Sequence, residues 1–91
     1  MTILMTSDMP GVDEEGYEHL AAALITRLRA ADGFISHAAS PIDGGYRVTE
    51  LWESADAHRA WFQASVIPML PPDVPAPQVS TQPITTLATR D

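Results

Sequence analysis

The chain contains no cysteine, no lysine and no asparagine. Without cysteine there can be no disulfide, no thiolate nucleophile and no cysteine-bound metal. Without lysine, Schiff-base catalysis and the phosphate-binding lysine of a P-loop are excluded. The formal net charge is −7, and the five basic residues, all arginine, are scattered along the chain. Nucleic-acid surfaces need clustered cations that displace counterions, so this composition argues against a nucleic-acid partner.

Long apolar runs and several catalytic motifs are also missing. The sequence has no stretch of about 18 apolar residues and no basic-then-apolar start, so it predicts neither a membrane span nor a secretory signal. We therefore expect a cytoplasmic protein with no membrane partner. No G-x-S-x-G, H-E-x-x-H or G-x-G-x-x-G motif occurs. His19, His37 and His58 fall on three separate predicted elements without ligand spacing, so no metal site is expected.

A length of 91 residues predicts one domain, residues 1–91, with a thin core. A domain of this size buries roughly 60–65% of the surface of its unfolded chain and is marginally stable alone. Association with a second copy stabilises the folded state. The length therefore favours a homodimer.

Apolar periodicity and turn residues divide the chain into four strands and two helices. The expected strands lie near Ile3–Ser7, Phe34–Ser40, Gly45–Trp52 and residues 78–89, and the expected helices span residues 14–32 and 55–67. The order β-α-β-β-α-β is that of the ferredoxin-like fold, an α+β arrangement in which a four-stranded antiparallel sheet carries two helices on one face. The other sheet face would be bare, and a second copy of the chain would cover it.

Caps and breakers set the expected ends of these elements. Asp13 is a plausible N-cap of the first helix, and Gly33 suits its stop. One apolar stripe at helical spacing contains Tyr17, Leu20, Ala21, Leu24 and Leu28. Ser54 caps the second helix, Pro68 ends it, and its inward face is expected to carry His58, Trp61, Phe62 and Ser65. Pro83 in the last strand indicates an edge position or a bulge.

The central hairpin concentrates large side chains with polar tips on one face. If "PIDG" is the turn and Ser40 pairs with Gly45, one face combines Ile35, His37 and Ala39 with Tyr46, Val48, Glu50 and Trp52. An unpaired buried carboxylate costs several kcal/mol, so Glu50 must be paired, protonated or beside water. A ligand pocket, mostly apolar with a few aimed polar groups, meets that requirement.

Each of these residues also has an ordinary structural interpretation. His37 can be a satisfied core or surface histidine, and Glu50 can pair with an arginine such as Arg47 or Arg59 or reach solvent. Trp52, Trp61 and Phe62 can simply fill the core, and Tyr46 can anchor a strand end. A cavity of about 300 Å³ or more beside Trp52 would separate a ligand site from a pocket filled by its own side chains.

Three stretches, "GFISH", "GGYRV" and "WESADAHRAWF", resemble the antibiotic biosynthesis monooxygenase family of dimeric α+β barrels. The resemblance covers the chain from about Thr2 to Thr86. It implies a homodimer in which two four-stranded sheets form a barrel, with a ligand pocket between sheet and helices in each subunit.

One branch of that family oxidises polycyclic anthrones to quinones with molecular oxygen and no cofactor. The resemblance places Trp52 at the tryptophan that lines the pocket in that branch, and His58 at its proton-relay tyrosine. Val48 stands where that branch has an asparagine that stabilises the oxyanion of the substrate, which removes a donor worth roughly 3 kcal/mol in such sites. Histidine in place of tyrosine keeps a proton carrier with a pKa nearer neutrality.

A second branch degrades haem. Trp61 matches its second-helix tryptophan, but Pro71 occupies the position of its histidine, and the first strand offers Thr6 and Ser7 in place of its asparagine. The resemblance therefore does not extend to haem degradation.

The resemblance and the hairpin together predict a cofactor-independent monooxygenase that acts on a hydroxylated polycyclic aromatic of polyketide type by proton abstraction and reaction with O₂. The expected catalytic residues are His58, His37, Trp52 and Glu50, and the expected substrate-binding residues are Tyr46, Val48, Trp61, Phe62 and Ile35. Either His58 or His37 would be the base. The alternatives are a cyclase or isomerase on the same substrate class, and a non-catalytic protein that binds a small molecule.

Overall fold

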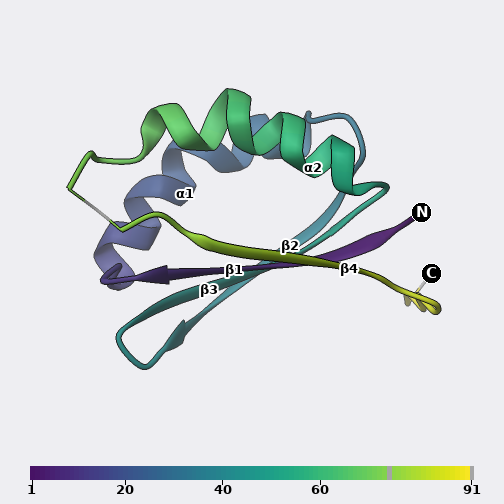
Figure 1. The fold of residues 1–91 in the computed structure, drawn as a ribbon, viewed down its shortest axis with the longest axis horizontal. Helices are drawn as coiled ribbons and strands as arrows, with labels where there is room; N and C mark the ends of the chain where they lie inside the picture. Colours follow the sequence, from purple (N-terminus) through teal and green to yellow (C-terminus); the bar gives the residue numbers. More distant parts are fainter. Residues whose placement is uncertain (74, 91) are drawn as a thin grey trace.

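The computed structural model describes residues 1–73 and 75–90, and it confirms the β-α-β-β-α-β order (Figure 1). The elements are β1 (Ile3–Pro10), α1 (Glu14–Arg29), β2 (Phe34–Ile42), β3 (Gly45–Trp52), α2 (Ala55–Trp61), η1 (Phe62–Val66), η2 (Ile67–Met69) and β4 (Gln78–Pro83). Within the described part of the chain, no helix combines the length and apolarity that crossing a bilayer requires.

The four strands form one antiparallel sheet in the order β2-β3-β1-β4. Both helices lie over the same face of this sheet (Figure 1). Along β1 the residues alternate between buried and half-buried, because successive side chains of a strand point to opposite faces. The α+β ferredoxin-like architecture is therefore confirmed, and Pro83 lies in the edge strand β4, as predicted.

Helix α1 has the predicted cap and the predicted buried stripe. The Asp13 carboxylate accepts the Gly16 N–H at 2.8 Å, which satisfies one of the free amides of the first turn. The helix ends at Arg29, earlier than expected, and Gly33 lies in the following turn with a φ of 84°. Leu28 is buried against the sheet, at the end of the stripe that begins with Tyr17.

The second helix begins as predicted but does not continue as a regular α-helix. The Ser54 hydroxyl accepts the Ala57 N–H at 3.1 Å. After Trp61 the backbone becomes a π-helix, in which the Ile67 N–H bonds to the Phe62 carbonyl, and then a short 3₁₀-helix. The wider turn brings Val66 to the inner face, where α-helical spacing predicts Ser65.

The predicted hairpin register is wrong by two residues. Strand β2 continues through Ile42, which pairs with Gly45 around a two-residue connection, and Gly44 there has a φ of 76°. From Ser36 to Ile42, a shift of two keeps each side chain of β2 on its predicted face, and it places His37 directly opposite Glu50. A bulge at Ile35 then lets Phe34 pair with Trp52.

The core lies between the helices and the sheet. Its buried apolar residues are Ile3, Met5, Met9, Leu28, Tyr46, Val48 and Trp52. Trp52 is fully enclosed and forms a T-shaped contact with Phe34, with ring centroids 5.6 Å apart. Three polar side chains share this interior, Ser7, Glu50 and His58, and they mark where the site is formed.

A substitution at Gly45 tests how closely the backbones of β3 and β1 approach each other. A Cβ on Gly45 would collide with the carbonyl oxygen of Met9 on the neighbouring strand. Because a backbone atom cannot move aside cheaply, Gly45→Ala is expected to lower the free energy of unfolding by about 1–3 kcal/mol. Urea denaturation measures this, and Ser40→Ala, an exposed position in the same sheet, is the control, with an expected change within about 0.5 kcal/mol. Equal stability of Gly45→Ala and the parent chain would contradict the close approach.

Candidate functional site

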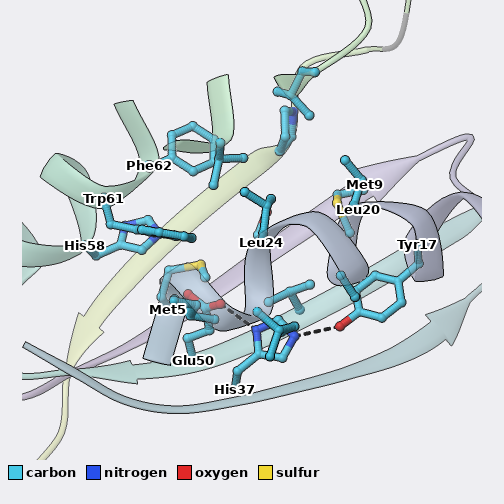
Figure 2. A pocket seen from close by; sticks show the side chains of 18 residues that line it. Met5, Met9, Tyr17, Leu20, Leu24, His37, Glu50, His58, Trp61 and Phe62 are labelled. Carbon is cyan, nitrogen blue, oxygen red and sulfur yellow. Dashed lines mark hydrogen bonds and ion pairs between the residues drawn. The ribbon is translucent and has the colours of Figure 1, made fainter. Parts of the chain in front are cut away.

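A hollow of about 80 Å³ lies between the helices and the sheet (Figure 2). Its floor comes from β1, β2 and β3, its walls from α1 and α2, and its cover from η1 and the segment that follows. The lining residues are Met5, Ser7, Met9, Tyr17, Leu20, Ala21, Leu24, Ile25, Leu28, His37, Val48, Glu50, His58, Trp61, Phe62, Val66, Leu70 and Pro77. Most of this lining is apolar, and the five polar members are gathered on the sheet and on the facing turns of the two helices.

The Glu50 carboxylate is buried and accepts hydrogen bonds on both oxygens. The Trp52 indole N–H donates to Oε1 at 2.9 Å, and His37 Nδ1 lies 2.6 Å from Oε2. An indole nitrogen can only donate, so Oε1 must be an acceptor. Such bonds to a charged acceptor are short and strong, which is how the fold holds a carboxylate with 5% exposure.

The Tyr17 hydroxyl extends this network to α1. It lies 2.7 Å from His37 Nε2. When the carboxylate accepts Nδ1–H, the other nitrogen of a neutral imidazole is an acceptor, so the phenol is the donor to it. Figure 2 shows Glu50, His37 and Tyr17 connected in this order, from the floor of the hollow to its α1 wall.

The phenol of Tyr17 is held in its protonated form. Its ring stacks on that of Tyr46 with centroids 4.9 Å apart and planes 2° apart. Burial raises the pKa of Tyr17 above its usual value, and the negative charge of Glu50 raises it further. Tyr17 is therefore a hydrogen-bond donor at neutral pH.

His58 is a buried imidazole without a hydrogen-bond partner among the described residues. It is 4% exposed and lies against the rings of Trp52 and Phe62, at 5.6 and 5.7 Å between centroids. Burial lowers the pKa of His58; the charge of Arg59 lowers it further, and Glu50 opposes both. A neutral imidazole therefore faces the hollow, with its nitrogens available to a ligand.

The two arginines that could have neutralised Glu50 are engaged elsewhere. Arg47 lies on the other face of the sheet and pairs with Asp8 at 2.7 Å, which lowers the pKa of that carboxyl. Arg59 pairs with Asp56 at 2.8 Å on the outer surface of α2. Glu50 therefore depends on His37 and Trp52 alone within the described chain.

The structure brings six of the nine predicted site residues to the hollow and leaves three outside its lining. The six are His37, Val48, Glu50, His58, Trp61 and Phe62. Trp52 lies behind Glu50 and acts on the site through its N–H. Tyr46 lies behind Tyr17, away from the lining. Ile35 is 39% exposed at the bulge of β2, so its side chain is not brought to the hollow.

Two polar residues of the lining, Tyr17 and Ser7, are not among the predicted site residues. Tyr17 was assigned only to the apolar stripe, although a phenol on that stripe could have indicated a polar partner on the sheet. Ser7 appears in the sequence only as one of two residues, with Thr6, at the position of the haem branch's asparagine, and it was not predicted as a site residue. It pairs with Val48 across β1 and β3, is 6% exposed, and its hydroxyl has no hydrogen-bond partner within residues 1–73 and 75–90.

The hollow alone is smaller than an ordinary ligand pocket. Its 80 Å³ falls below the roughly 300 Å³ that separates a ligand site from a self-filled one. It adjoins a groove of about 610 Å³ between α1 and the proline-rich segment, and both are lined by Met9, Leu20, Leu70 and Pro77. In the described chain, no group of three or more potential ligands could hold a metal ion.

This combination of fold and pocket agrees with the family comparison. The model of the family described as antibiotic biosynthesis monooxygenase matches residues 3–67, so the chain belongs to that family. No curated protein matches the chain.

Solved structures share the fold at low sequence identity. MhuD, a heme-degrader from Mycobacterium tuberculosis solved with two hemes in its active site, is 18% identical with a TM-score of 0.61, over 96% of this chain and 99% of that one. SnoaB, a cofactor-independent oxygenase from Streptomyces nogalater, is 14% identical with a TM-score of 0.63, over 98% of this chain and 95% of that one. At these identities the comparison establishes the fold.

Because His58 is buried and neutral, we expect the free energy of unfolding to depend on pH. Its folded pKa is lowered, so the unfolded chain binds the proton more readily. The contribution of His58 is therefore fully present above the unfolded pKa of about 6.5 and is lost as the pH falls below it.

Urea denaturation between pH 8 and pH 5 measures this contribution. The free energy of unfolding of the parent chain should fall relative to that of His58→Gln as the pH drops through 6.5. His19→Gln, at an exposed position on α1, is the control for the loss of a histidine. Identical pH dependence in His58→Gln and the parent would show that His58 is not held neutral.

Proposed function

We propose that the chain is a cofactor-independent monooxygenase that acts on a hydroxylated aromatic small molecule of the polycyclic, polyketide type. The reaction would begin with proton abstraction by an imidazole of the site, after which O₂ reacts with the substrate carbanion. For an anthrone, the CH₂ group and O₂ give a carbonyl group and water, so the substrate itself supplies all four electrons.

One observation carries this proposal: buried acid–base groups face an apolar hollow without being fully used by the protein. His58 offers free nitrogens, and the His37–Glu50 pair lies across the hollow from it. Trp61 and Phe62 provide flat apolar surfaces on the same side as His58 (Figure 2). A flat molecule with hydroxyl groups suits both features. Family membership and the fold shared with SnoaB support oxygen as the second reactant.

Ser7 supplies a hydrogen-bond donor next to the position where the resemblance indicates that the oxyanion-binding asparagine is replaced. Val48 occupies the position of the oxyanion-binding asparagine, and Ser7 pairs with it on the adjacent strand. The Ser7 hydroxyl lines the same part of the hollow and is free to donate to a ligand. We assign it the role of stabilising the oxyanion that deprotonation creates.

A tricyclic substrate needs more room than the hollow contains. The adjoining groove provides it, since Leu20 and Leu70 line both the hollow and the groove. The reacting ring would occupy the hollow, and the outer rings would extend toward the groove.

We also propose that the active form is a homodimer, with the second copy covering the sheet face that carries Thr6 and Thr49. Size-exclusion chromatography with light scattering tests this oligomeric state.

Incubation with 1,8-dihydroxyanthrone tests the reaction. We expect faster quinone formation than in buffer, with one O₂ consumed per quinone, and a loss of about 10²–10⁴-fold in His37→Gln/His58→Gln because both imidazoles are removed. Gln63→Ala, an exposed position on η1, is the control. No acceleration over buffer would refute the oxygenase. Tautomerisation of the anthrone without oxygen and without quinone formation would indicate an isomerase. A thermal shift without any conversion would indicate a binding protein.

Ser7→Ala tests the oxyanion assignment in the same assay. The expected result is a fall of about 100-fold in kcat, since a donor aimed at developing charge acts mainly in the transition state. Ser80→Ala removes a hydroxyl from exposed β4 and should have no effect. Equal kcat for Ser7→Ala and the parent would remove Ser7 from the mechanism.

A further inference from the structure

Tyr17, His37 and Glu50 form a linear acid–base unit whose outer end is the phenol. The links are 2.7 Å from the phenol to Nε2 and 2.6 Å from Nδ1 to the carboxylate. A hydroxyl bonded to an imidazole that is itself oriented by a carboxylate is the general arrangement for activating a hydroxyl. We propose that Tyr17 is the catalytic residue that exchanges protons with the substrate, and that His37 and Glu50 act through it as positioning residues. This inference rests on the proposed function.

The geometry favours this unit over His58 as the proton acceptor. Nε2 of His37 is already occupied by the phenol, so a substrate reaches His37 only through Tyr17. When His37 is protonated, it forms an ion pair with the Glu50 carboxylate, which stabilises the positive charge. Burial and the nearby cation of Arg59 disfavour a protonated His58; the charge of Glu50 opposes them, but no carboxylate of the described chain forms an ion pair with His58. His58 therefore stays neutral and accepts a hydrogen bond from a substrate hydroxyl.

The proton path balances within the proposed reaction. The substrate C–H proton passes to the Tyr17 oxygen while the phenolic proton passes to Nε2, and the electron pair stays on the substrate carbon. That carbanion reduces O₂ and forms a C–O bond as a peroxide anion. Tyr17 returns the proton to the peroxide and recovers its own from His37. Loss of the second C–H proton with cleavage of the O–O bond then gives the carbonyl group and water.

Paired variants separate a chemical role from a structural one. Tyr17→Phe keeps the ring stack and removes the hydroxyl, and we expect kcat to fall by about 100-fold with KM changed less than about twofold. Tyr46→Phe removes the hydroxyl of the other ring of the stack, which lies outside the lining, and should retain kcat. His58→Gln should mainly raise KM. A Tyr17→Phe variant as active as Tyr46→Phe would overturn the proposal.

Tyr17 can be labelled selectively, because the chain contains only two tyrosines. In the Tyr46→Phe background, biosynthetic incorporation of 3-fluorotyrosine places the fluorinated, more acidic phenol at position 17 alone. The ionisable groups facing it are His37 on β2, Glu50 on β3 and His58 on α2. We expect the basic limb of the kcat profile to move to lower pH. An unmoved profile would assign Tyr17 a purely structural role and overturn the proposal.

The hydrogen-bond pattern of His37 can be measured without substrate, so the Tyr17–His37–Glu50 unit can be tested separately from the oxygenase activity. ¹⁵N spectra of the imidazoles should report Nδ1–H on His37 with Nε2 as an acceptor, and the Nε2 signal should shift in Tyr17→Phe but not in Tyr46→Phe. A proton on Nε2 in the neutral form would reverse the phenol–imidazole bond and overturn the relay, whatever the assay with anthrone shows. The expected tautomer without oxidation of the anthrone would instead refute the oxygenase and leave the acid–base unit intact.

Discussion

The buried carboxylate of Glu50 is the constraint on which the site depends. A charge removed from water costs several kcal/mol unless it is paired and hydrogen-bonded, and here the compensation comes from an indole and an imidazole. Each bond to a charged acceptor returns about 1.5–3 kcal/mol. Satisfying Glu50 therefore fixes the orientation of His37 and Trp52, and through His37 that of Tyr17 on α1.

This constraint also links the two layers of the domain. Trp52 is the largest enclosed side chain and packs against Phe34 and His58, so the same indole that stabilises the carboxylate also positions the second helix. Tyr17 joins the first helix to β2. In a domain of this size the core is too small to separate stability from chemistry, and the residues that hold the helices on the sheet are those that line the hollow.

The helical cover has the least regular backbone around the hollow. The π-helix of η1 turns Phe62 and Val66 inward, and the segment beyond η2 reaches the same lining through Leu70 and Pro77. Irregular helical turns of this kind occur frequently at functional sites, since the local widening aims side chains that an α-helix would direct elsewhere. The floor is the opposite case, a continuous antiparallel ladder that holds Glu50 and His37 in register.

Composition, periodicity and caps were sufficient for the element order, the α+β architecture and the capping residues Asp13 and Ser54, because these depend on neighbours within a few positions along the chain. Alternation along the hairpin also placed His37 and Glu50 on one face, since a register error of two residues preserves the faces. Only the tertiary structure determined that Tyr17 meets His37, that Ser7 lies beside Val48, and that Trp52 lies behind the site. Those contacts depend on how elements far apart in the sequence pack together, and local sequence patterns carry no information about that packing.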